Sequence, residues 1–297
     1  MSPLTLLPIQ LAVSVAFLGI LARARRERLP RGRDGQLLGR LGLLNPWLAY
    51  ALSLIGLTQI TASLSVLLWA SEPILILGLA AVALGERVGR AVLGASAVAI
   101  AGLLLVSFDP AATGSAPGIA LTIAGVAVCA AYTVAARSWL PRTSDSTLGV
   151  VLAQQLYALG LAVLVLGGLI AGRWIAIPER LSVTGVLSAA ASGLLYYAFA
   201  YLFYLSALRR VQASIAAASF YLIPVFGLAG GWLIGEALEP VQWLGALLVV
   251  ASVAVVTVRS ARPAAGELDG TTPSDSQPSS AAASAQMATS PSDASLS

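Results

Sequence analysis

Long runs without a charged residue follow one another along most of the chain. They cover residues 1–22, 41–71, 91–108, 110–136, 146–172, 181–208, 211–235 and 240–258. Each run reaches or exceeds the ~18 apolar residues that mark a candidate membrane-spanning helix. A soluble domain does not contain eight such runs. The pattern therefore predicts an all-α polytopic membrane protein.

Within these runs we predict nine transmembrane helices. They are expected at residues 3–22, 41–58, 61–85, 91–108, 117–137, 147–170, 182–206, 212–235 and 241–258. The first should be retained, because its arginines follow the apolar stretch, whereas a signal peptide carries its positive charge before it. After Val258 the chain turns rich in Ser, Ala, Pro and Asp, so 259–297 is expected to be a disordered cytoplasmic tail.

The basic residues, all of them arginine, indicate the orientation. If the N-terminus lies outside and nine helices alternate, fifteen arginines fall on the inner side and only Arg173 and Arg180 on the outer side. Such an excess of positive charge is typical of cytoplasmic loops. We therefore expect a multi-pass protein of the cell membrane with its C-terminus in the cytoplasm.

The composition excludes several kinds of site. Of the residues, 58% are hydrophobic and 10% charged, and the chain has no histidine and one cysteine, Cys129. A metal site, a disulfide framework and Ser-His catalysis therefore lack their usual residues, and we expect no cofactor. An aspartyl active site needs two carboxylates, and only one lies deep in a predicted helix, so no enzyme is expected. The net charge of +4 is spread over the loops, which argues against nucleic-acid binding.

Two segments of the chain repeat a pattern of Ala-Ser, then Pro ten residues later, then Gly-Glu and Gly. The pairs Ala62/Ala213, Ser63/Ser214, Pro73/Pro224 and Gly94/Gly245 are 151 positions apart, and Gly85/Gly235 and Glu86/Glu236 are 150 apart. Five predicted helices separate the copies. An odd number places the copies in opposite directions across the bilayer. Inverted repeats are typical of secondary transporters, whose site lies near the midplane between the halves.

The two segments resemble the EamA-type repeat of the drug/metabolite transporter superfamily. The matching stretches begin at "GLTQITASLSVLLWASEPILILGLAAVALGERVGR" and "ALRRVQASIAAASFYLIPVFGLAGGWLIGEALEPV". The resemblance covers about residues 2–258 and implies a ten-helix carrier that alternates between inward and outward states. It also implies an exporter of amino acids, metabolites or drugs.

The chain departs from that pattern at its start. The helix at 117–137 begins the second copy, and its counterpart in the first copy would lie before Met1. We therefore expect four helices in a first repeat at 1–110 and five in a second at 117–258. Two explanations stay open, a start codon further upstream and a nine-helix form.

Glu72 is the leading candidate for a functional residue. It is the one charge in the middle of a predicted helix, and it precedes Pro73. A charge at the bilayer centre costs at least ~2.5–3.5 kcal/mol and faces the bundle interior or a water-filled cavity. This suits proton-coupled exchange, with sodium coupling as another option. The alternative is a neutral Glu72 that donates a hydrogen bond to a carbonyl freed by Pro73.

Other polar and aromatic residues are expected to line the same cavity. Tyr197 and Tyr201 share one helix face, and buried amides or hydroxyls in a bilayer need protein or water partners. Packing is the alternative for each. The full set of candidates for substrate binding or proton coupling is Glu72, Trp69, Tyr132, Gln154, Gln155, Tyr197, Tyr201 and Tyr221.

Proline and glycine positions suggest moving and packing parts. Pro73 and Pro224 are expected to bend paired helices beside the cavity and to act in gating, with tolerated kinks as the alternative. Gly227, Gly231 and Gly235 form two consecutive GxxxG steps, which favour close helix packing. Glu86 and Glu236 end helices at the water boundary, where we expect capping or ion-pair roles.

Taken together, these features predict a secondary transporter for small organic solutes. We expect alternating access coupled to protons, a lipid bilayer as surroundings, and a monomer or homodimer. The alternative is a receptor or assembly protein that keeps the fold but transports nothing. No nucleotide-binding G-x-x-x-x-G-K-S/T string is present, so direct coupling to ATP is unsupported.

Overall fold

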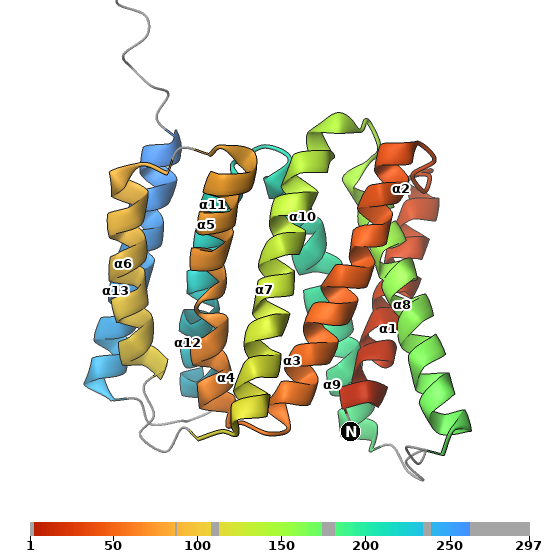
Figure 1. The fold of residues 1–297 in the computed structure, drawn as a ribbon, viewed down its shortest axis with the longest axis horizontal. Helices are drawn as coiled ribbons and strands as arrows, with labels where there is room; N and C mark the ends of the chain where they lie inside the picture. Colours follow the sequence, from red (N-terminus) through yellow and green to blue (C-terminus); the bar gives the residue numbers. More distant parts are fainter. Residues whose placement is uncertain (1–2, 87, 108–112, 174–181, 234–238, 262–297) are drawn as a thin grey trace, which may run out of the picture. The chain divides into compact units, whose positions relative to one another are not determined.

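The computed structural model describes residues 3–86, 88–107, 113–173, 182–233 and 239–261. The helices appear in Figure 1. In chain order they are α1 (Pro3–Ala24), α2 (Arg33–Arg40), η1 (Leu41–Leu43), η2 (Leu44–Leu48), α3 (Ala49–Leu57), α4 (Ala62–Trp69), α5 (Glu72–Leu84), α6 (Arg90–Ser107), α7 (Ala116–Trp139), η3 (Leu140–Arg142), α8 (Thr147–Ala171), α9 (Val183–Ser192), η4 (Gly193–Ala200), α10 (Tyr201–Leu208), α11 (Ala213–Ala218), η5 (Ser219–Tyr221), α12 (Leu222–Leu233) and α13 (Pro240–Ala261).

Among the described residues, six helical stretches are long and apolar enough to cross a membrane. They are Thr5–Ala24, Leu64–Leu84, Ala116–Arg142, Thr147–Ala171, Val183–Leu208 and Pro240–Val258, and Arg90–Val106 and Ala213–Phe226 are shorter apolar helices. This agrees with a polytopic helical membrane protein. The count of nine spans and the inverted repeat stay predictions. The predicted tail at 259–297 lies outside the described residues from 262 onward.

The segment predicted as one helix at 41–58 is longer and less regular. Its helical course begins at Arg33 with α2, which buries Gly35, Leu38 and Gly39. The course then passes through a 3₁₀ turn and a π-helical turn before α3. Asn45 interrupts the helix with φ −144° and ψ 117° ahead of Pro46, as the residue before a proline is pushed out of the α region. The sequence pattern did not predict the interruption.

Pro73 and Pro224 each follow an interruption of their helix. α4 ends at Trp69, and α5 begins at Glu72 with Pro73 in its first turn, where a proline needs no N–H partner. In the second copy a 3₁₀ turn at Ser219–Tyr221 separates α11 from α12. Both prolines therefore follow a short irregular turn. Glu72 is the first residue of α5, and it still lies within the apolar span Leu64–Leu84.

α3 and α7 approach closely through small residues. A β-carbon added to Gly56 would lie 2.4 Å from the Thr122 hydroxyl, and one added to Gly125 would lie 2.2 Å from the Ser53 hydroxyl. Small residues on facing helices allow such close approach in membranes. Close packing through glycines was predicted for the eighth helix. Among the described residues, packing of this kind occurs between α3 and α7.

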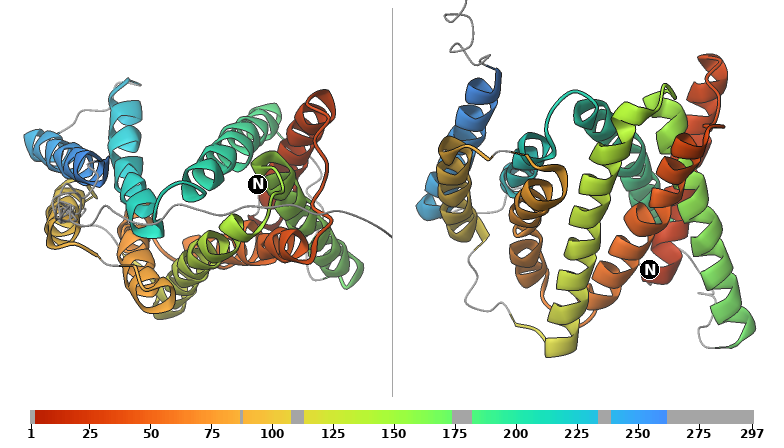
Figure 2. Two further views of the ribbon diagram at one scale, coloured as in Figure 1. Left: turned by 90° about the horizontal axis from the view of Figure 1, so that it is seen from above. Right: turned by 45° about the horizontal axis from the view of Figure 1, so that its top comes forward.

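Helices far apart in the sequence pack side by side. α6 packs along α13, and α1 packs along α8 and η4 (Figures 1 and 2). Gly102 of α6 meets Gly245 of α13, where a β-carbon on either would lie within 2.7 Å of the other's carbonyl oxygen. The first and second predicted repeats therefore share these contacts, rather than each packing only within itself.

The largest buried cluster joins residues of α1, α2, α5, α7, α8, η4, α10 and α11, and smaller ones lie where α6, α12 and α13 meet. Many large apolar side chains point outward instead, among them Val82, Leu164 and Phe226. An outward apolar surface suits a protein surrounded by lipid rather than water.

Candidate functional site

Glu72 begins α5 and is buried, with 5% of its surface exposed. Its Oε1 has no hydrogen-bond partner. In the described part of the chain it is the one acidic residue within the apolar spans, and no arginine there forms an ion pair with it. A buried carboxylate without a cationic partner is costly. The site therefore favours a bound proton or a cationic group beside Glu72.

A chain of polar side chains leads from Glu72 across three other helical segments. The Cys129 thiol of α7 lies close enough to the Glu72 carboxylate for the two groups to interact electrostatically. The Asn45 amide of η2 donates to the Cys129 sulfur at 3.0 Å, and the Tyr201 hydroxyl of α10 donates to the Asn45 side-chain oxygen. All four side chains are buried. The interruption at Asn45 thus places an amide between α7 and α10.

Beside this polar chain the structure gathers an aromatic cluster, which we define as Tyr50, Trp69, Tyr132, Tyr196, Tyr197 and Tyr201. Tyr50 stacks on Trp69 at 5.7 Å between ring centroids and meets Tyr196 and Tyr197 edge-on. Tyr201 stacks on Tyr197 at 6.1 Å and lies 6.5 Å from Tyr132. Tyr196 stays 40% exposed, so the cluster keeps an open edge. Ring faces of this kind attract cations and aromatic groups.

Gln154 ties the cluster to the neighbouring segment. Its side-chain oxygen accepts from the Tyr132 hydroxyl at 2.9 Å, and its nitrogen donates to the Leu38 carbonyl at 3.0 Å. Gly42 allows the two backbones to meet, because a β-carbon there would lie 2.1 Å from the Gln154 carbonyl oxygen. Gln154 is fully buried and both of its polar atoms are used. It therefore positions Tyr132.

Gln155 holds the π-helical segment η4. Its side-chain nitrogen donates to the Tyr197 carbonyl at 2.8 Å, and its side-chain oxygen is buried without a partner. π-helical turns often occur at functional sites, and here the segment carries Tyr196 and Tyr197. The unpartnered oxygen is a second buried acceptor near the cluster.

The remaining predicted residues lie elsewhere or outside the described part. Tyr221 is buried and packs with Ala99, Leu103 and Val249 of α6 and α13. Pro73 is buried in the first turn of α5, and Pro224 is half-buried in α12. Gly227 and Gly231 belong to α12, but their surroundings are not among the described features, and Gly235 and Glu236 lie outside the described residues.

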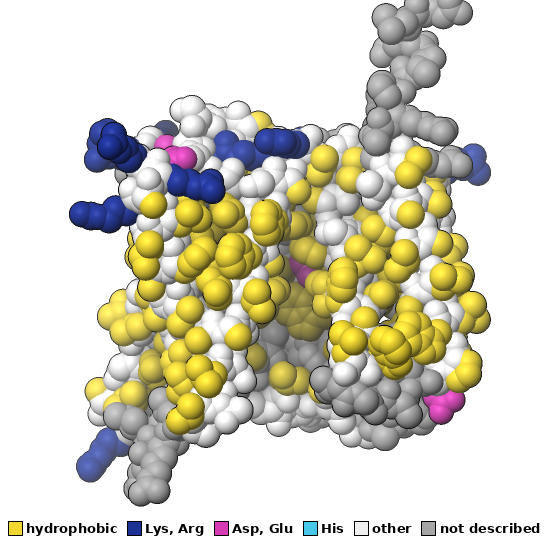
Figure 3. Space-filling model, turned by 180° about the vertical axis from the view of Figure 1, so that it is seen from behind, with side chains coloured by type: hydrophobic (Ala, Val, Ile, Leu, Met, Phe, Trp, Pro, Cys, Tyr) yellow, Lys and Arg dark blue, Asp and Glu magenta, His cyan; other side chains and the backbone are white. Residues whose placement is uncertain are grey.

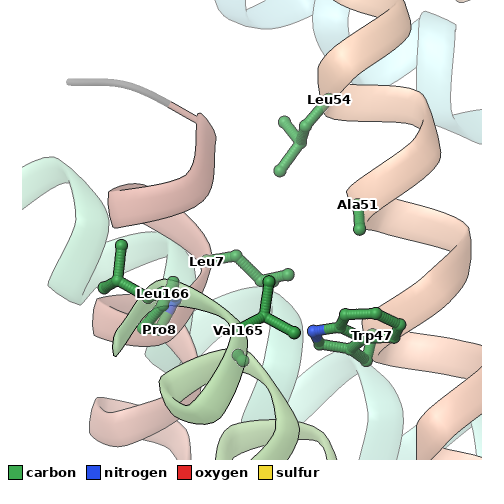
Figure 4. A pocket seen from close by; sticks show the side chains of 8 residues that line it. Leu7, Pro8, Trp47, Ala51, Leu54, Val165 and Leu166 are labelled. Atoms are coloured by element: carbon green, nitrogen blue, oxygen red, sulfur yellow. The ribbon is translucent and has the colours of Figure 1, made fainter. Parts of the chain in front are cut away.

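Figure 3 shows a hollow in one face of the molecule, with acidic atoms at its inner end and arginines gathered along the rim above it. A separate cavity of about 20 Å³ lies among Leu7, Pro8, Trp47, Ala51, Leu54, Ala162, Val165 and Leu166, and Figure 4 shows Trp47 facing Val165 across it. That cavity has about the volume of one water molecule and is lined by apolar side chains. It is therefore too small for an organic solute.

The described residues contain no group of three or more His, Cys, Asp and Glu side chains that could hold a metal ion. Tyr50, Cys129 and Tyr196 were not among the predicted site residues. Asn45 has a sequence signal, a lone amide in an apolar run before a proline. Cys129 has none, since a buried cysteine usually behaves as a small apolar residue.

Comparison with known proteins agrees with this architecture. The model of the EamA-like transporter family matches residues 1–108 and 116–258. No curated protein matches the chain. A solved structure titled "Crystal structure of protein" superposes with a TM-score of 0.71 at 21% sequence identity, over 87% of this chain and 90% of that one, which shows a shared fold. Because the family match takes in most of the chain, the protein belongs to the EamA-like transporter family, within the drug/metabolite transporter superfamily.

Proposed function

We propose that the protein is a secondary transporter that moves small organic solutes across the cell membrane by alternating access, driven by protons that bind Glu72. The observation that carries this proposal is the buried carboxylate of Glu72, which lacks a cationic partner and ends a polar chain beside an aromatic cluster. We place the arginine-rich end in the cytoplasm and propose export as the direction.

Proton coupling is supported by the surroundings of Glu72. The side chain is 5% exposed, and the cost of burying its charge is relieved when it takes up a proton or meets a cationic group. The two events compete for the same oxygen atoms. A carrier that exchanges a proton for a solute needs this competition.

The aromatic cluster supports an organic solute as cargo. Tyr50, Trp69 and Tyr196 are partly exposed and present ring faces, while Asn45 and Gln155 bring amide groups to the same region. Such a mixture of apolar walls and few polar groups is typical of small-molecule sites. Neutral, zwitterionic and cationic solutes fit it. The remaining predicted site residue, Tyr221, packs against α6 and α13, and its role in the site stays a proposal.

We further propose that the breaks before Pro73 and Pro224 act as hinges. The regular α-helical hydrogen bonding already shifts to a 3₁₀-type bond at Ser71, whose N–H donates to the Leu68 carbonyl, and a 3₁₀ turn covers Ser219–Tyr221. Bending at these points requires fewer hydrogen bonds to break than in a continuous helix.

The test uses proteoliposomes with a pH-sensitive dye trapped inside. Each of the twenty amino acids, choline and tetraethylammonium is added outside, and solute-dependent proton movement is recorded for the wild type, Glu72→Gln and Glu239→Gln. Glu239 is exposed and lies outside the predicted site, so it provides the matched control. We expect proton movement with the wild type and Glu239→Gln and none with Glu72→Gln. Full movement with Glu72→Gln would refute the coupling role.

The same preparation addresses the alternative of a receptor that transports nothing. A transporter binds its solute, so the solute should raise the melting temperature of the purified protein and also move across the membrane. A solute that stabilises the protein but is never taken up would favour the receptor.

A further inference from the structure

The carboxylate of Glu86 joins the two predicted repeats at the arginine-rich end. It accepts hydrogen bonds from the backbone nitrogen of Ala213 at 2.8 Å, the backbone nitrogen of Ser214 at 3.1 Å and the Ser214 hydroxyl at 2.7 Å. Both carboxylate oxygens take part. Hydrogen bonds to an ionised acceptor are stronger than neutral ones, so this contact is the firmest polar link described between α5 and α11.

The local backbone aims Glu86 at its partners. α5 ends at Gly85, which adopts a left-handed conformation with φ 64°. This turn suits glycine because it has no β-carbon. The chain leaves the helix axis at this point, and the next side chain reaches the start of α11. The link therefore depends on where the end of α5 lies.

The start of α11 has no cap of its own. Gln212 holds the N-cap position in an extended conformation, φ −61° and ψ 151°, and its side chain makes no capping hydrogen bond. The matching position of the first copy is Thr61, with nearly the same backbone angles, and its hydroxyl caps α4 by accepting from Leu64. Helices α7, α8 and α9 also carry their own serine caps. α11 alone among these five borrows its cap, from a residue 127 positions earlier.

An open cavity with both polar and apolar lining borders this contact. It has a volume of about 460 Å³ and is lined by Leu84, Gly85, Glu86, Arg137, Pro141 and Gln212. Arg137 donates to the Leu208 carbonyl at 3.0 Å and so fixes the neighbouring ends of α7 and α10. Glu72 begins α5, and Glu86 follows the other end of the same helix, so the Glu86 contact and this cavity lie at the opposite end of α5 from Glu72.

We propose that Glu86 is a gating residue, and that its contact with Ala213 and Ser214 closes the arginine-rich end in the conformation seen here. The inference rests on the proposed function in so far as a carrier must open this end at another stage. Opening separates α5 from α11, and the three hydrogen bonds break together. A local cap at Gln212 would stabilise α11 in every state, whereas the borrowed cap stabilises it only when the end is closed.

The experiment measures access to Cys129, the one cysteine of the chain, which is buried beside Glu72. A membrane-impermeant cationic thiosulfonate is added to sealed vesicles from the arginine-rich face. An exposed Arg210→Cys reporter identifies the vesicles that present this face. We expect slow labelling of the wild type and labelling at least ten times faster in Glu86→Ala. Ser146→Ala removes a cap that α8 provides for itself, and it should label at the wild-type rate.

A rescue variant separates gating from simple capping. In Glu86→Ala/Gln212→Thr, α11 regains a local cap like that of Thr61, but the repeats stay unlinked. We expect its melting temperature to return toward the wild-type value while labelling of Cys129 stays fast. Return of both to wild-type values would overturn the proposal, because Glu86 would then be a cap only. So would an unchanged labelling rate in Glu86→Ala.

A milder variant covers the case in which Glu86→Ala fails to fold. Ser214→Ala removes one of the three hydrogen bonds and should speed labelling about two- to threefold. A wild-type rate in Ser214→Ala would then count against gating. None of these measurements needs a solute or a proton gradient. They therefore succeed or fail separately from the transport assay with Glu72→Gln.

Discussion

The hydroxyl of Tyr201 donates a hydrogen bond to the side-chain oxygen of Asn45, a residue 156 positions earlier in the chain. Both side chains are buried, and the bond links α10 to the interrupted segment ahead of α3. It completes the polar chain that ends at Glu72. The following predictions examine this chain and the packing that supports it.

Replacing Tyr201 with phenylalanine should destabilise the protein. The ring stays, but Asn45 keeps a buried oxygen without its donor, which costs about 1–3 kcal/mol. The measurement is the melting temperature of the purified protein in detergent, followed by tryptophan fluorescence. Tyr157→Phe is the control, because Tyr157 is 40% exposed and makes no described hydrogen bond through its hydroxyl. Equal melting temperatures for the two variants would contradict the buried bond.

Gln154→Leu should be more destabilising than Tyr132→Phe. Loss of the glutamine side chain leaves both the Leu38 carbonyl and the Tyr132 hydroxyl without partners, at about 1–3 kcal/mol each. Loss of the tyrosine hydroxyl leaves only the Gln154 oxygen. Equilibrium unfolding in mixed micelles gives the free energies. The double variant should lose less than the two single losses together, by about 0.5–3 kcal/mol, and strict additivity would argue against the contact.

Gly125→Ala should force α3 and α7 apart. The new β-carbon would lie 2.2 Å from the Ser53 hydroxyl and 2.6 Å from the Ala49 carbonyl oxygen. Overpacking of this kind costs about 1–3 kcal/mol. Gly160→Ala is the control within α8, since nothing lies within 4 Å of its added carbon. The same unfolding assay should show loss of stability for Gly125→Ala only, and a stable Gly125→Ala would mean that the helices are not in such close contact.

Trp69→Ala should weaken solute binding. Trp69 stacks on Tyr50 at the partly exposed edge of the aromatic cluster. Without its ring we expect about a tenfold loss of affinity for a solute found in the transport screen, equivalent to about 1.4 kcal/mol, and Trp69→Phe should lose less. Titration calorimetry provides the affinities. Trp243→Ala in α13 should bind like the wild type, and an equal loss there would remove the special role of Trp69.

The sequence predicts best those residues that conflict with their surroundings. A carboxylate in an apolar run has to be buried or face a cavity, so Glu72 could be singled out, and it lies buried at one end of the polar chain. Tyr197 and Tyr201 could be placed on one face from their spacing, and their rings do stack. The helical ranges of α1, α7, α8 and α13 also agree with the predicted ones to within a few residues.

Contacts between helices could not be predicted in the same way. Cys129 and Tyr50 join the site because α7 and α3 pack closely, and that packing depends on small residues on both helices. Tyr221 was chosen by its place in the second copy, and its packing against α6 and α13 has no signal in the sequence spacing. Sequence spacing describes one helix at a time, whereas the partner of each face is decided by the assembled bundle.

The packing of α1 along α8 and of α6 along α13 has a consequence during biosynthesis. More than 120 residues separate the end of α1 from the start of α8. Because translation proceeds at about 5–20 residues per second, α8 is made on the order of ten seconds after α1. During that time the face of α1 that packs against α8 has lipid, the insertion machinery or an earlier helix as its neighbour. The Ser14 hydroxyl of α1 is buried and makes no hydrogen bond in the finished fold, so it does not depend on a later helix for a hydrogen-bond partner. The nascent protein therefore acquires its final tertiary contacts only when its last helix has entered the bilayer.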